Sequence, residues 1–159
     1  MSLNQVKNVS LLPFALSNVS SAEDFKITRN SWNQGTFNLN HSDTGEETQK
    51  VFIRVADDLD ELKNLTRLDL VKIDVEGFEY RVLKGLFNTL YRFRPRIIFE
   101  FDHNYWLKSG NDIAACYNLL QSLHYALYQI TSVGCEYIHS LNDIKNGNIF
   151  CIQENSESQ

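Results

Sequence analysis

Four carboxylates and one imidazole gather at the ends of two apolar runs of the chain, residues 68–74 and 96–102. They are Asp74, Glu76, Glu100, Asp102 and His103. An open parallel sheet binds its ligands just beyond the carboxyl ends of its strands. If both runs are strands of such a sheet, these side chains overhang one crevice. The spacing therefore predicts a binding or catalytic site on this rim.

Segment 74–77 is the most informative part of the rim. Gly77 allows a tight turn or a close approach of the backbone to a ligand. Asp74 and Glu76 precede a predicted helix, whose N-terminal dipole stabilises negative charge. Two interpretations stay open for Asp74, namely a cap of that helix and a functional carboxylate.

The remaining rim residues also have two interpretations each. Glu100 is either a binding residue or the partner of a basic neighbour such as Arg96. His103 is either a general base, because an imidazole titrates near neutral pH, or a hydrogen-bonded surface residue. Asp74, Glu100 and Asp102 carry oxygen ligands that suit a divalent metal, but their spacing does not require one, and we expect no metal.

Two helical stripes of apolar residues alternate with the acid-tipped strands. The first stripe consists of Val75, Phe78, Val82, Leu83, Leu86 and Leu90. The second consists of Ile113, Cys116, Tyr117, Leu120 and Leu123. Two further strands are predicted at 125–130 and 148–152. This alternation is typical of crossover connections on a sheet covered on both faces. We therefore predict an α/β three-layer sandwich with a mostly parallel sheet and an antiparallel edge strand.

The N-terminal part predicts three short strands, at 9–15, 25–28 and 51–55, and a short helix at 57–65. Pro13 has no amide hydrogen to donate, which favours a sheet edge or a bend for the first strand. The polar stretch 29–50 is a long loop, and loops of this length are usually functional or mobile.

Composition narrows the class of protein. The chain has 159 residues, of which 43% are hydrophobic, which indicates one domain, residues 4–152, and a flexible tail, residues 153–159. The net charge of -5 argues against a broad nucleic-acid interface. No apolar run is long enough for a membrane span, and the start does not read as a signal peptide. Three cysteines without a CxxC pair favour reduced thiols. A cytoplasmic protein is expected.

Three segments, in this order and spacing, resemble the core of the FkbM family of S-adenosylmethionine-dependent methyltransferases. They are residues 72–79 (KIDVEGFE), 82–85 (VLKG) and 95–100 (PRIIFE). The resemblance extends over residues 8–152 and implies a partial Rossmann-like methyltransferase fold. The family's first two strands and their glycine-rich cofactor loop have no counterpart here. This implies a C-terminal fragment whose strand at 68–74 has an unpaired edge and whose first strand has no neighbour. Such an edge predicts a homodimer, unless the first strand closes the gap.

The resemblance implies transfer of a methyl group from S-adenosylmethionine to a hydroxyl of a sugar or secondary metabolite. The residues that it implies are, for the cofactor, Ala15, Leu16 and Asp74; for the substrate, Gly35 and Glu100; and for catalysis, Glu76 and His103. Because the glycine-rich loop is missing, a second interpretation is a non-catalytic scaffold or binding module. Neither interpretation predicts a nucleic-acid or membrane partner.

Overall fold

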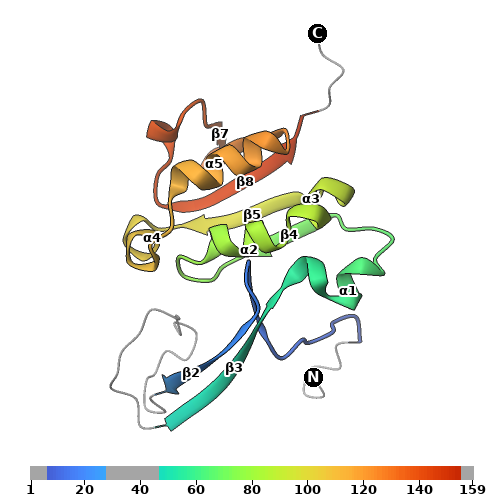
Figure 1. Ribbon diagram of the computed structural model, residues 1–159. Helices are drawn as coiled ribbons and strands as arrows, with labels where there is room; N and C mark the ends of the chain where they lie inside the picture. The colour runs from blue at the N-terminus through green and yellow to red at the C-terminus, as the bar shows by residue number, and fades with distance from the viewer. Residues whose placement is uncertain (1–6, 28–46, 155–159) are drawn as a thin grey trace.

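The computed structural model describes residues 7–27 and 47–154, whose strands form two sheets (Figure 1). The three-stranded sheet has the order β1-β3-β2, with β1 at Ala15–Ser17, β2 at Ser21–Ile27 and β3 at Glu47–Val55. The five-stranded sheet has the order β4-β5-β8-β6-β7. Its strands are β4 (Leu70–Ile73), β5 (Arg96–Phe101), β6 (Tyr125–Thr131), β7 (Gly134–Tyr137) and β8 (Gly147–Gln153).

The helices are short and connect the strands of these sheets. Two 3-10 turns, η1 and η2, lie at Ala56–Asp58 and Leu141–Asp143. The α-helices are α1 (Asp60–Lys63), α2 (Glu79–Gly85), α3 (Phe87–Phe93), α4 (His103–Ser109) and α5 (Ile113–Ser122). None of the helices in the described ranges combines the length and the apolar character that crossing a membrane requires.

The expectation of a mostly parallel sheet is wrong. In the larger sheet β4 and β5 are parallel, whereas β8 is antiparallel to both β5 and β6, and β7 is antiparallel to β6. The reason lies in the last two strands. β7 follows β6 through a tight hairpin, whose strands must be antiparallel, and β8 then inserts between β5 and β6. Strands β4, β5 and β6 still run in one direction, as the crossover pattern predicts.

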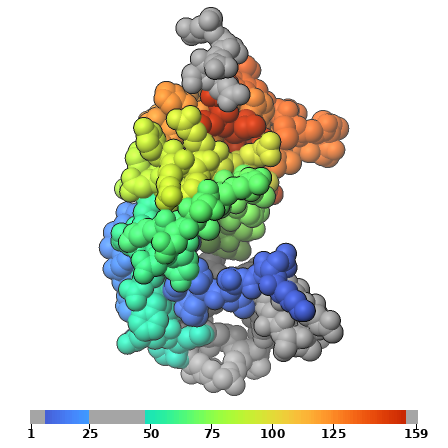
Figure 2. All heavy atoms as spheres, turned by 90° about the vertical axis from the view of Figure 1, so that its right-hand side faces the viewer, coloured from blue at the N-terminus to red at the C-terminus, as the bar shows by residue number. Residues whose placement is uncertain are grey.

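The helices cover one face of the five-stranded sheet (Figure 1), so the described residues form two layers rather than the expected three-layer sandwich. Ile97 and Phe99 are buried on the helical face, while Ile98 between them points to the other face and is half-buried. The continuous apolar run of β5 therefore did not signal cover on both faces. Figure 2 shows that the molecule is hollowed on the side away from the helices, between the β6–β7 hairpin and the blue N-terminal segment.

The first strand is shorter than predicted and starts just after Phe14, because the preceding residues 7–14 form no regular structure. It pairs in parallel with β3, with Ala15 opposite Ile53, so the expectation that it has no neighbour is wrong. It also packs on α2, where a Cβ atom on Gly85 would overlap the carbonyl of Ser17. Glycine is therefore required at position 85 for this contact.

The edge of β4 is open within the described ranges, as predicted, since β4 pairs there with β5 alone. Strand β1 does not close this gap, because its partner is β3. The homodimer through this edge stays a prediction.

Candidate functional site

The two acid-tipped strands lie side by side, which confirms the geometric prediction for the rim. β4 and β5 are parallel with Ile73 opposite Phe99, so Asp74 and Glu100, the next residues, are neighbours at the same end of the sheet. Burial raises the pKa of the Glu100 carboxyl, and Asp74, within hydrogen-bonding reach, raises it further. The positive charge of Lys72 lowers the pKa of Glu100. The Lys72 Nζ atom lies 3.2 Å from Oδ2 of Asp74.

The chain leaves β4 through a turn whose two central residues have positive φ, 54° at Glu76 and 100° at Gly77. The Phe78 N–H closes it by donating to the Val75 carbonyl over 3.3 Å. Positive φ is ordinary for glycine but uncommon for glutamate. At Gly77 a Cβ atom would lie 2.5 Å from the Tyr105 carbonyl oxygen. The turn is thus pressed against the start of α4.

This turn places the Glu76 carboxyl against the phenol of Tyr105. A hydrogen bond to Glu76 and its negative charge raise the pKa of the Tyr105 phenol. The second carboxylate oxygen of Glu76, Oε2, is buried and has no hydrogen-bond partner within the described ranges. A buried polar atom without a partner is costly in a folded protein. The rim therefore holds one acceptor that a ligand can satisfy.

Helix α4 is anchored over β5 by Trp106, whose ring packs edge-on against Phe101 at 5.3 Å between centroids. Asp102 caps this helix and accepts from the backbone N–H groups of Asn104 and Tyr105 at 2.9 and 3.1 Å. His103 begins the helix with an exposed side chain, and its backbone N–H donates to Asn146 Oδ1. His103 thus lies on the predicted rim beside a structural aspartate.

The alternative interpretations of the rim carboxylates can now be decided in part. Asp74 does not cap α2, because Phe78 is the N-cap and no side chain bonds there. Within the part of the chain that the structure describes, no ion pair joins Glu100 to Arg96, and the charged neighbour with the largest effect on the pKa of Glu100 is Asp74. Asp74 and Glu100 are therefore free of the structural roles considered for them.

Sequence comparison assigns this architecture to a family. The family model described as Methyltransferase FkbM domain matches residues 3–130. The chain belongs to the FkbM methyltransferase family. It is also similar to a protein named Methyltransferase 1 from Beauveria bassiana (strain ARSEF 2860), with 34% identity over 85 residues, 52% of this chain and 32% of that protein. The chain spans about a third of the length of this curated relative. No solved structure matches the chain.

The family match confirms the resemblance and includes the whole rim of this FkbM chain, from Asp74 to Tyr105. Other predicted site residues lie elsewhere. Ala15 and Leu16 are on β1 in the smaller sheet, where Leu16 packs against the core, and Gly35 lies outside the described residues. No three His, Cys, Asp or Glu side chains in the described ranges lie close enough together to hold a metal ion.

Two residues of the FkbM rim were not among the predicted site residues. The sequence leaves two interpretations for Tyr105, packing over the following helix or lining a substrate pocket, and its phenol contacts Glu76. Glu79 is 1% exposed and bonds to the turn before α2. The contact of Tyr105 with the turn joins helix α4 to the loop after β4, which no local pattern encodes. The signal for Glu79 was a charged residue within the apolar stripe of α2.

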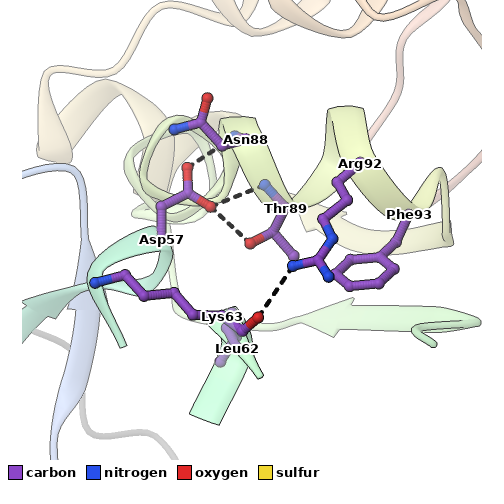
Figure 3. A pocket seen from close by; sticks show the side chains of 7 residues that line it. All are labelled: Asp57, Leu62, Lys63, Asn88, Thr89, Arg92 and Phe93. Atoms are coloured by element: carbon purple, nitrogen blue, oxygen red, sulfur yellow. Dashed lines mark hydrogen bonds between the residues drawn. The ribbon is translucent and has the colours of Figure 1, made fainter. Parts of the chain in front are cut away.

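A separate small pocket lies between α1 and α3 (Figure 3). Its lining residues are Asp57, Leu62, Lys63, Asn88, Thr89, Arg92 and Phe93. Its volume is about 100 Å³, below the roughly 300–1,000 Å³ of small-molecule sites. Asp57 accepts the backbone N–H groups of Asn88 and Thr89 at 2.7 and 2.9 Å and the Thr89 hydroxyl at 2.6 Å. These contacts cap α3, and the role of the pocket is structural.

Proposed function

We propose that this FkbM chain serves in S-adenosylmethionine-dependent methyl transfer to a hydroxyl group of a sugar or secondary metabolite. The observation that supports the proposal best is the pairing of Asp74 with Glu100 at the carboxyl ends of adjacent parallel strands. That is where open α/β sheets bind their ligands. Both residues lie within the segment that matches the FkbM domain.

The charge of the rim fits the cofactor. S-adenosylmethionine carries a cationic sulfonium and a cationic ammonium group, and its sulfonium supplies an electrophilic methyl group. Asp74 and Glu76 offer carboxylates to such a cation, and Glu76 Oε2 is an acceptor that lacks a partner in the described ranges. We assign Asp74 to the cofactor, together with Ala15 and Leu16 of β1.

The other rim residues suit an alcohol acceptor. A hydroxyl must lose its proton as its oxygen gains a methyl group, so a nearby base assists. His103 is the proposed base, Glu76 is proposed to shape the pocket for the cofactor and the acceptor, and Glu100 and Gly35 are the proposed contacts of the acceptor. Burial and the neighbouring Asp74 raise the pKa of the Glu100 carboxyl, which offers a hydrogen-bonding group to the acceptor. Most of the catalytic effect would come from alignment of the two reactants.

The second candidate is a non-catalytic scaffold or binding module. One observation favours it: the sequence contains no GxGxxG segment, the motif that places a dinucleotide at a helix N-terminus. In this case the rim carboxylates would bind a cationic ligand other than S-adenosylmethionine.

Calorimetric titration of the chain with S-adenosylmethionine separates the two candidates. We expect a dissociation constant in the micromolar range and a loss of about tenfold in affinity for Asp74→Asn, since a charge-assisted contact is removed. Asp69→Asn is the matched control, because Asp69 is an exposed aspartate before β4 that pairs with Arg67. Heats equal to those of dilution would overturn the proposal for this chain and favour the scaffold.

A further inference from the structure

The most enclosed charged side chain near the rim is that of Glu79, the first residue of α2. Its exposed fraction is 1%. Its Oε1 accepts the backbone N–H of Val75 at 3.0 Å, and its Oε2 accepts that of Gly77 at 3.0 Å. One buried carboxylate thus binds the two ends of the turn that carries Glu76.

The opposite side of the turn is held by side chains from the end of α4. Ser109 Oγ donates to the Gly77 carbonyl at 2.7 Å, and the Asn111 side-chain amide donates to the same oxygen. Asn111 also donates to Ser109 Oγ at 2.8 Å, and Arg81 donates to the Ser109 carbonyl at 2.9 Å. Gly77 is therefore fixed through both its N–H and its carbonyl by side chains alone.

These contacts matter because Glu76 has a φ of 54°. A non-glycine residue persists in this conformation only where its surroundings impose it. Without acceptors for the Val75 and Gly77 amides, the turn would relax. Glu76 would then leave the phenol of Tyr105, and Asp74, at the start of the turn, would lose its fixed place beside Glu100.

We propose that Glu79 is the positioning residue of the rim: its carboxylate fixes the turn so that Asp74 faces Glu100 and Glu76 faces Tyr105. Its meaning for catalysis rests on the proposed function, but the positioning itself can be measured without cofactor or acceptor. The competing role is a purely structural one, in which Glu79 stabilises α2 and leaves the rim unaffected.

The test is Glu79→Gln in the whole chain, followed by NMR. Glutamine has one acceptor oxygen in place of two, and its NH₂ group would face a backbone N–H. We expect the amide hydrogens of Val75 and Gly77 to exchange about tenfold faster or more. We also expect the midpoint of the Glu100 carboxyl titration to move down towards that of an ordinary glutamate. Asp74 and Glu76, which raise the pKa of Glu100, would be displaced from it, whereas Lys72 on β4 would continue to lower that pKa.

Val82→Ala is the matched control, because Val82 is a buried residue of the same helix whose apolar side chain makes no hydrogen bond to the turn. It should lower stability and leave the Glu100 midpoint unchanged. An unchanged midpoint in Glu79→Gln, or an equal shift in Val82→Ala, would overturn the proposal. Because the Glu79 charge itself acts on Glu100, Glu79→Gln lowers this midpoint directly as well, and Ser109→Ala, which keeps that charge, decides between the two causes. It loosens the turn from the other side and should shift the same midpoint in the same direction by less.

Calorimetry on the same samples keeps the two proposals apart. A shifted Glu100 midpoint in a chain that binds no S-adenosylmethionine supports the positioning role and refutes the proposed function. If Glu79→Gln still binds S-adenosylmethionine and the Glu100 midpoint does not shift, the proposed function is supported and the positioning role is refuted.

Discussion

At Gly77 the backbone runs so close to that of Tyr105 that no side chain fits between them. The residue before it, Glu76, is held in a conformation that glutamate rarely adopts. The two features together bring the Glu76 carboxyl of this turn against the Tyr105 phenol of helix α4. The chemistry of the rim therefore depends on Gly77, although glycine itself carries no functional group.

Gly77→Ala should therefore destabilise the fold more than replacement of a glycine whose Cβ position is open. Positive φ alone costs about 1 kcal/mol for alanine, and the overlap with the Tyr105 carbonyl adds about 1–3 kcal/mol. Gly110→Ala is the control, because Gly110 has a φ of 67° but nothing within 4 Å of its missing Cβ. Urea unfolding of both variants measures the difference. Equal losses would show that the close approach to Tyr105 has no energetic effect.

Burial of Glu79 predicts a pH dependence of stability. Burial raises its pKa above the ordinary 4.5, against the effect of its backbone hydrogen bonds. A group whose pKa is higher in the folded state contributes stability that is full below pH 4.5 and is lost as the pH rises through the folded-state value. The free energy of unfolding of the wild type should then fall more steeply above pH 4.5 than that of Glu79→Gln.

Urea unfolding from about pH 4 to about pH 8 checks this slope. Glu100, whose pKa is also raised, faces Glu79 from β5 and titrates in both proteins. If Glu79→Gln also lowers the Glu100 pKa, the variant curve becomes flatter still. Parallel curves for the two proteins would contradict the prediction.

Among the elements, the acid-tipped strands β4 and β5 could be predicted from the sequence, whereas β7 and the position of β8 could not. An apolar run that ends in a carboxylate marks both β4 and β5, and their shared end follows from parallel pairing. Nothing in 134–137 marks β7, because all four residues are exposed. The place of β8 between β5 and β6 is a matter of long-range pairing, which periodicity does not record. For the same reason the sequence could not tell that Asp102 caps a helix while Asp74 faces Glu100.

Helix α3 illustrates a cap supplied by a distant segment. Its N-cap, Leu86, offers no side-chain acceptor, and Asp57 of η1 takes the free N–H groups instead. Asp57→Ala should lower the free energy of unfolding by about 1–2 kcal/mol. Asp58→Ala is the neighbouring control, because the Asp58 side chain makes no such contact and is exposed. Thermal unfolding of the two variants would refute the capping role if their midpoints fall by the same amount.

At the scale of the whole molecule, the five-stranded sheet has an open edge at β4 and helices on one face only, as far as residues 7–27 and 47–154 show. An uncovered edge offers unpaired N–H and C=O groups to another strand. Leu70, at the start of β4, is 52% exposed, which gives such pairing an apolar contact. These features favour the homodimer expected from the sequence.

Leu70→Lys should shift this dimer towards the monomer, because an edge lysine opposes strand pairing. Size-exclusion chromatography with light scattering measures the mass at several concentrations. Leu107→Lys is the control, since Leu107 is 71% exposed on α4, away from the edge. A monomeric wild type, or equal effects of the two lysines, would contradict a dimer through β4.

Dye labelling of the thiols offers a way to measure how the two chains of such a dimer are arranged. Cys116 and Cys151 are buried, and burial raises the pKa of both, so a maleimide dye at neutral pH reacts with the exposed Cys135 instead. Cys135 lies on β7, at the far edge of the sheet from β4. Two chains joined at β4 would form one continuous sheet and carry their dyes at its outer borders, about 40 Å apart at ordinary strand spacing. Energy transfer between those dyes would report this separation.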